Sequence, residues 1–173
     1  MTLHWSTGHI SPMKILLLRA ISALLKCIGR MFTPRPRKDP TVRIEGIDTE
    51  MTAAIAAARA TLPNYWQPLK HREHGESQFS LKVKISDGNT AEHFWAVDVT
   101  YENGIILGTI DNNPDIIKIV KLGQRIQIRE QDITDWGYVR DGRMFGKYTL
   151  RAILNRLPPL DAAKFRRILS NEP

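Results

Sequence analysis

The chain has 173 residues, of which 42% are hydrophobic and 25% charged, with a formal net charge of +7 and one cysteine. This length supports one domain with a substantial core and is short for two domains. The composition is that of a soluble globular protein. The single Cys27 excludes an intrachain disulfide, which fits a reducing compartment.

The excess positive charge lies before Asp39. No acidic residue precedes that position, and its seven basic residues are Lys14, Arg19, Lys26, Arg30, Arg35, Arg37 and Lys38. Of the 25 Lys and Arg residues, 25 − 7 = 18 remain, against 18 Asp and Glu. The rest of the chain is therefore formally neutral, whereas a general grip on phosphate needs uncompensated Lys and Arg. We expect no nucleic acid as a partner.

An amphipathic helix is predicted over residues 15–32. Its polar residues share one arc of about 100°, and they are Arg19, Ser22, Lys26, Gly29 and Arg30. A transmembrane span is disfavoured, because Arg19 and Lys26 would each cost roughly 2.5–3.5 kcal/mol near the bilayer centre. A secretory signal is disfavoured because the longest uninterrupted apolar run covers only residues 15–18.

A helix lying in the membrane interface fits this pattern better. The basic Pro-rich stretch 34–38 adds attraction to an anionic membrane surface, on the order of 1 kcal/mol per basic residue. The residues predicted to contact the membrane are Leu17, Arg19, Ile21, Leu24, Lys26 and Arg30. We therefore expect a cytoplasmic protein, peripheral on the inner face of the membrane. The alternatives are that this helix packs on protein or directs targeting, and either Met1 or Met13 is the true start.

The chain divides into two parts. Residues 1–41 hold the amphipathic basic helix and a linker stiffened by prolines at 34, 36 and 40, and residues 42–173 form a single domain. Within the domain, helical spacing of apolar residues predicts a helix from Glu50, with Asp48 as its N-cap and Pro63 ending it. A turn is predicted over 63–66 and a loop over 70–77.

A series of short antiparallel strands is predicted next, joined by tight turns at Asp87-Gly88, Asn103-Gly104 and Asp141-Gly142. On the second strand, alternation places Trp95, Val97, Val99 and Tyr101 on one face. The predicted strands cover residues 79–85, 93–101, 105–110, 116–120 and 125–129, and a last hairpin follows within 135–148.

Two helices are predicted to close the chain. The first covers residues 150–157, and the second, basic and amphipathic, is capped by Asp161 and carries Phe165, Ile168 and Leu169. Helices flanking a run of hairpins indicate an α+β fold. We predict an antiparallel, strongly twisted sheet of about five to six strands with flanking helices.

Residues that could carry chemistry are few. His71, Glu73, His74 and His93 fit no standard zinc spacing, and no cysteine lies near them. The sequence has no Gly-x-Ser-x-Gly elbow and no Gly-rich phosphate loop. We predict no catalytic residue, metal or cofactor. The alternative is an enzyme with an unrecognised site, either at His71, His74 and His93 or at Lys147, Tyr148 and Arg151.

The stretch 135–151 is the best candidate for a binding surface, because it combines large aromatic side chains with cations, the types enriched at binding hot spots. The candidate residues are Trp136, Tyr138, Arg140, Lys147, Tyr148 and Arg151. The competing interpretation is that Trp136 and Tyr148 belong to the core, and that the arginines line its rim or pair with Asp135 and Asp141. Trp95 is predicted to be a core residue.

The same stretch resembles the ending of a YegJ-like bacterial family of domains of unknown function. The resemblance covers roughly residues 50–157 and implies a compact bacterial α+β domain, with no established activity or catalytic residues. The segments that carry it are 133–138, 141–144 and 146–151, and upstream 57–59, 62–63 with Trp66, 79–83, 92–95, 111–114 and 122–123.

The function that we predict is that of a non-enzymatic, protein-binding module of accessory or immunity type. Residues 14–38 would hold it at a membrane surface, and the 136–151 surface would contact a protein partner. This prediction depends on the uneven charge distribution and on the missing catalytic motifs.

Overall fold

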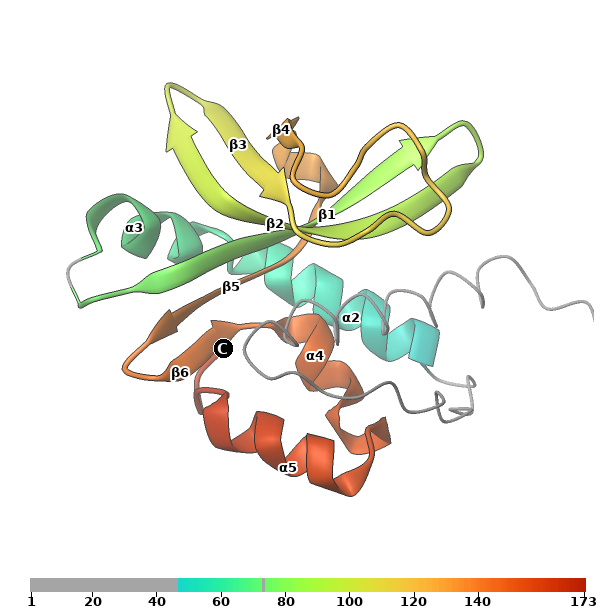
Figure 1. The fold of residues 1–173 in the computed structure, drawn as a ribbon. Helices are drawn as coiled ribbons and strands as arrows, with labels where there is room; N and C mark the ends of the chain where they lie inside the picture. Colours follow the sequence, from blue (N-terminus) through green and yellow to red (C-terminus); the bar gives the residue numbers. More distant parts are fainter. Residues whose placement is uncertain (1–46, 73) are drawn as a thin grey trace, which may run out of the picture.

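The computed structural model describes residues 47–72 and 74–173 (Figure 1). The amphipathic helix, the linker and all six predicted membrane contacts lie outside the described residues. Within them, no helix is long and apolar enough to cross a membrane. The elements are α2 (Ile47–Ala60), α3 (Pro63–His71), β1 (Ser77–Asp87), β2 (Thr90–Glu102), β3 (Ile105–Ile110), β4 (Arg125–Ile128), η1 (Glu130–Asp132), β5 (Ile133–Arg140), β6 (Arg143–Gly146), α4 (Tyr148–Ile153), η2 (Leu154–Arg156) and α5 (Pro159–Ile168).

The six strands form one sheet in the order β4-β3-β2-β1-β5-β6, and every neighbouring pair is antiparallel. Figure 1 shows that this sheet is twisted and that α4 lies between α2 and α5. The prediction of an α+β fold with an antiparallel sheet and flanking helices is confirmed.

Two hydrophobic cores hold the domain together. The first is formed by the sheet with α2 and α3, and it includes Leu81, Phe94 and Trp136. The second contains Trp95, together with residues of α4 and α5 such as Leu150 and Phe165. Alternation along the strands produces this division, because neighbouring residues of β2 point to opposite faces of the sheet.

The region after α2 differs from the prediction. Pro63 starts the new helix α3, although the sequence predicts a turn over 63–66 and a loop over 70–77. Proline is tolerated in the first helical turn, where its missing N–H has no partner to lose. Tyr65 and Leu69, four residues apart, then bury one face of α3. At the other end, α2 begins at Ile47, so Asp48 belongs to the first turn of the helix.

The predicted shared face of β2 is also wrong. Its pairing with β3 shifts register between Val97 and Thr100, and Asp98 has a φ of 50°. This bulge adds one residue and reverses the alternation. Val99 therefore packs in the first core, whereas Trp95 is buried in the second.

Residues 116–120 form no strand. The Glu92 carboxylate instead accepts hydrogen bonds from the backbone N–H groups of Asp115, Ile116 and Ile117, at 2.9–3.2 Å. These bonds satisfy the donors that a strand would have used in a ladder. The apolar run that predicts a strand is explained by burial of Ile117, which packs in the first core.

The C-terminal helices are shifted relative to the prediction. Helix α4 begins at Tyr148 and is followed by the η2 turn, and α5 begins at Pro159 with Pro158 as its N-cap. Asp161 lies within the first turn of α5.

After α5, Leu169 forms a bridge to Met144, and the Ser170 N–H donates to the Met144 carbonyl. The residues after α5 therefore cover the outer edge of β6.

Candidate functional site

The three aromatic residues of the predicted binding surface lie in the core. Trp136, Tyr138 and Tyr148 are 1%, 5% and 8% exposed. The Trp136 indole N–H donates to the Ala58 carbonyl of α2 at 2.9 Å, and the Tyr148 ring meets the Trp136 ring edge-on. These rings hold α2 and α4 against the sheet, as the competing interpretation expects. A binding role for them remains a prediction.

Arg140 joins two segments of the chain. Its guanidinium contacts the Glu76 carboxylate at 2.7 Å and lies over the rings of Tyr138 and Phe145. Burial by itself raises the pKa of Glu76, but hydrogen bonds from backbone N–H groups and from Arg140 outweigh it and lower that pKa. Glu76 therefore remains ionised and keeps Arg140 in place.

Arg151 has a similar structural role at the end of the domain. It donates to the Gly146 carbonyl at 2.7 Å and to the Ser170 carbonyl at 3.1 Å. Burial lowers the pKa of this guanidinium. The enzyme alternative needs Arg151, Tyr148 and Lys147 to act together. Their partners differ, because the Tyr148 ring packs on Trp136 and the Lys147 ammonium contacts Ser80.

Lys147 has an unusual position. Its φ is 54°, a left-handed conformation that costs a non-glycine residue roughly 1–2 kcal/mol. Its Nζ lies 2.8 Å from the Ser80 hydroxyl and 3.5 Å from the centroid of the Trp95 ring, a cation–π contact. Gly137 makes room for this side chain, because a Cβ there would lie 2.5 Å from the Lys147 Cε.

Asp135 fixes the backbone of the two residues that follow Lys147. The fully buried Asp135 carboxylate accepts hydrogen bonds from the N–H groups of Trp136, Tyr148 and Thr149, and from the Thr149 hydroxyl at 2.6 Å. It therefore satisfies N–H groups at the start of α4, where a negative charge is favoured. The segments 135–137 and 146–149, which carry much of the family resemblance, form one structural clasp.

Lys82 belongs to the same buried network. It is 4% exposed and donates to the Thr149 hydroxyl at 3.2 Å. In the sheet, Lys82 of β1 is paired with Trp95 of β2 on one side and with Asp135 of β5 on the other. Residues directly opposite each other in a sheet share a face. Lys82, Asp135 and Thr149 are buried and joined by hydrogen bonds through the Thr149 hydroxyl, so we assign this network a role in stability.

The histidines are dispersed. His71 and His74 are exposed, at the end of α3 and just before β1, whereas His93 is half-buried in β2. Burial lowers the pKa of His93 to about 3, assisted by the charges of Lys82, Lys84 and Arg59. No group of three or more His, Cys, Asp and Glu residues in the described parts of the chain is arranged to hold a metal ion.

A first hollow opens where β1 and β2 separate. Their pairing stops at Leu81 and Ala96, and both strands shift register just beyond, near Gln78 and Asp98. The result is a cleft of about 530 Å³, which we call the split cleft. It is lined by Arg72, Ser77, Gln78, Phe79, Ser80, Trp95, Val97, Asp98, Val99, Asp111, Tyr138, Val139, Met144 and Lys147. Two predicted binding residues, Tyr138 and Lys147, therefore line it.

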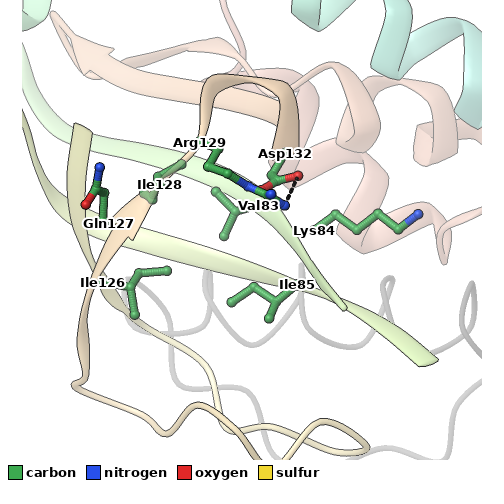
Figure 2. Close-up of a pocket in the computed structure, with 8 residues that line it drawn as sticks. All are labelled: Val83, Lys84, Ile85, Ile126, Gln127, Ile128, Arg129 and Asp132. Atoms are coloured by element: carbon green, nitrogen blue, oxygen red, sulfur yellow. Dashed lines mark hydrogen bonds and ion pairs between the residues drawn. The ribbon is translucent and has the colours of Figure 1, made fainter. Parts of the chain in front are cut away.

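A second hollow lies between β1 and β4, with a volume of about 400 Å³ (Figure 2). In Figure 2, Ile85 and Ile126 extend into the space between these strands, and the Arg129–Asp132 ion pair spans one end at 2.6 Å. We call this hollow the seam groove. It is lined by Val83, Lys84, Ile85, Ile126, Gln127, Ile128, Arg129 and Asp132. None of these residues is predicted from the sequence to belong to a site.

Residues 48–169 match the family described as uncharacterized protein conserved in bacteria (DUF2314). The chain belongs to this family. Uncharacterized protein YegJ of Escherichia coli K12 is 35% identical over 116 residues, which cover 67% of this chain and 74% of that protein.

A second relative, a putative ankyrin repeat protein of Neisseria meningitidis serogroup B, is 27% identical over 123 residues. The match covers 66% of this chain and 48% of that protein, so the chain spans about half the length of that relative. No solved structure matches the chain.

Proposed function

We propose that this domain is a protein-binding module that takes up an extended segment of a partner in the seam groove. The observation that carries the proposal is the pairing at this groove. Among the residues that the structure describes, β1 pairs with β2 alone beyond Val83, where its pairing with β5 ends. Among the described strands, β4 pairs with β3 alone. Two strand edges thus border one groove.

An open strand edge is a template for another strand, because its outward N–H and C=O groups have no ladder partner. The opposite edge of the sheet is different, because the residues after α5 cover β6 there. An extended peptide laid along β4 would form backbone hydrogen bonds in the manner of β-augmentation. It would also close the gap between β4 and the end of β1.

The groove chemistry indicates which partner would fit. Val83 and Ile128 are buried at its floor, and Ile85 and Ile126 form partly exposed walls. Since side chains alternate along a strand, every second residue of the partner segment would be apolar and face this floor. The exposed Lys84 at the rim of the groove favours a partner segment that has an acidic residue next to its apolar positions.

One relative gives independent support for a binding role. Part of the putative ankyrin repeat protein is similar to this domain. Ankyrin repeats in general form extended concave binding surfaces, and the name of this relative is therefore consistent with a binding role for the domain. An accessory or immunity-type role is consistent with this. Attachment to a membrane through residues 14–38 remains part of the proposal.

The test is a selection from a random peptide library displayed on phage, with the purified chain as the target. We expect selected peptides to alternate apolar and polar residues and to bind competitively with one another. Ile126→Arg and Ile85→Arg, on opposite walls of the groove, should each abolish their binding. Ile105→Arg is the matched control, because Ile105 is an exposed isoleucine of β3 outside the groove.

Circular dichroism and tryptophan fluorescence would establish that each variant is folded. The proposal fails if the wild-type chain selects no peptide. It also fails if folded Ile126→Arg and Ile85→Arg variants bind the selected peptides as well as the Ile105→Arg control does.

A further inference from the structure

Left-handed backbone conformations are concentrated at the split cleft. Six described non-glycine residues have positive φ, and Asn103 and Asp141 among them belong to hairpin turns. The other four, Arg72, Gln78, Asp98 and Lys147, all line the split cleft. Strained backbone that gathers at one concavity is typical of binding sites, and β-bulges near such sites redirect side chains.

The cleft is lined by acidic and basic residues that come from different segments of the chain. Asp98 lies in β2, and the Asp111 N–H donates to the Trp95 carbonyl of the same strand at 2.8 Å. Arg72 precedes β1, and Lys147 follows β6 and donates its N–H to the Trp136 carbonyl of β5. The acidic residues are thus attached to backbone next to Trp95 of β2, and the basic residues to segments next to β1, β5 and β6.

Between these charges the lining is mainly apolar. The lining residues of this type are Phe79, Trp95, Val97, Val99, Tyr138, Val139 and Met144. Its volume of about 530 Å³ lies within the range of roughly 300–1,000 Å³ of small-molecule sites. Trp95 adds a buried indole N–H that has no hydrogen-bond partner in the described structure.

We propose that the split cleft binds a small zwitterion with apolar side chains, an amino acid or a dipeptide. Its carboxylate lies toward Lys147 and Arg72, its ammonium group lies toward Asp98 and Asp111, and its side chains contact the apolar lining. This site is independent of the proposed function, because the split cleft and the seam groove share no lining residue.

The experiment is an NMR titration of the full chain with leucyl-leucine, N-acetyl-leucyl-leucine and leucyl-leucine amide. The signals followed are the backbone amides of Gln78 and Asp98 and the indole N–H of Trp95. Leucyl-leucine should give saturable shifts at millimolar concentration or below. Each blocked dipeptide should bind roughly tenfold more weakly, because it loses one charge-assisted hydrogen-bonded group.

Two variants separate the contributions of the two charges. Asp98→Asn should remove the preference for a free ammonium group, and Lys147→Met should remove the preference for a free carboxylate. Lys84→Met is the control, because Lys84 lines the seam groove and should leave both preferences intact. If Lys147→Met does not fold, the exposed Asp98 position decides the test alone.

The proposal is overturned if leucyl-leucine gives no saturable shift, or if either blocked dipeptide binds as tightly as the free one. Shifts confined to residues 84–85 and 126–128 would also overturn it. That last result would place the dipeptide in the seam groove and would leave the proposed function intact.

Discussion

Gly146 offers a sharp test of the clasp between β5 and α4. It has a φ of 71°, and a Cβ built there would lie 2.5 Å from Cε3 of Trp136 and closer still to the Trp136 carbonyl oxygen. Gly142, in the turn of the same hairpin, has a φ of 69° and nothing within 4 Å of such a Cβ. Alanine at the two positions therefore differs mainly in what its methyl group meets.

The expected loss in free energy of unfolding follows from two effects. Left-handed backbone costs an alanine roughly 1–2 kcal/mol at either position. At Gly146 the methyl group must also displace the Trp136 ring or its carbonyl, and overpacking of this kind costs about 1–3 kcal/mol. We expect Gly142→Ala to lower the free energy of unfolding by about 1–2 kcal/mol, and Gly146→Ala by about 2–5 kcal/mol. The larger value is a serious loss for a domain stabilised by roughly 5–15 kcal/mol.

Urea unfolding followed by tryptophan fluorescence measures both variants, with unchanged m-values required for the comparison. A Gly146→Ala variant that is no less stable than Gly142→Ala would refute the reasoning. In that case, contact with the Trp136 ring would not be what requires glycine at position 146.

Three further predictions concern the buried network, pH and the membrane. Thr149→Val removes the hydroxyl shared by Lys82 and Asp135 and should cost about 1.5–3 kcal/mol, whereas Thr149→Ser, which keeps it, should cost about 1 kcal/mol. The unfolded chain protonates His93 near pH 6.5 but the folded chain only near pH 3, so stability should fall across that window as pH drops, by up to about 1.4 kcal/mol per unit; His93→Gln should lack this contribution. Deletion of residues 1–38 should release the chain from anionic liposomes.

Each of these predictions has a contrary result. Equal stability of Thr149→Val and Thr149→Ser would mean that the hydroxyl does not matter to the network. A pH dependence of unfolding that is the same in wild type and His93→Gln would contradict the lowered pKa of His93. Unchanged liposome binding after the deletion would rule out the amphipathic helix as the attachment, and neutral liposomes serve as the control surface.

Local signals in the sequence predict much of the fold. Asn103-Gly104 and Asp141-Gly142 lie at the predicted hairpin turns, where positive φ is needed. The bulge at Asp98 has no such signal, because aspartate occurs in many backbone conformations. The result is that alternation predicts one face for Trp95 and Val99, and the structure separates them.

The candidate sites were less predictable, because they depend on pairing between distant strands. The combination of aromatic and cationic residues in the stretch 135–151 identifies Lys147 and Tyr138, which do line the split cleft. No local pattern in the sequence indicates that β1 and β2 are unpaired before Leu81. Nor does any indicate that β5 stops pairing with β1 at Val83. Those two endpoints create the split cleft and the seam groove.

The most direct test of strand addition at the seam groove is amide hydrogen exchange of the full chain, with and without a peptide selected as above. Binding should slow exchange in β4, over residues 125–128, and in the end of β1, over residues 84–87, because backbone N–H groups there gain hydrogen-bond partners or are shielded from solvent. Bound peptide with unchanged exchange in both segments, or with protection confined to β5 and β6, would contradict the account.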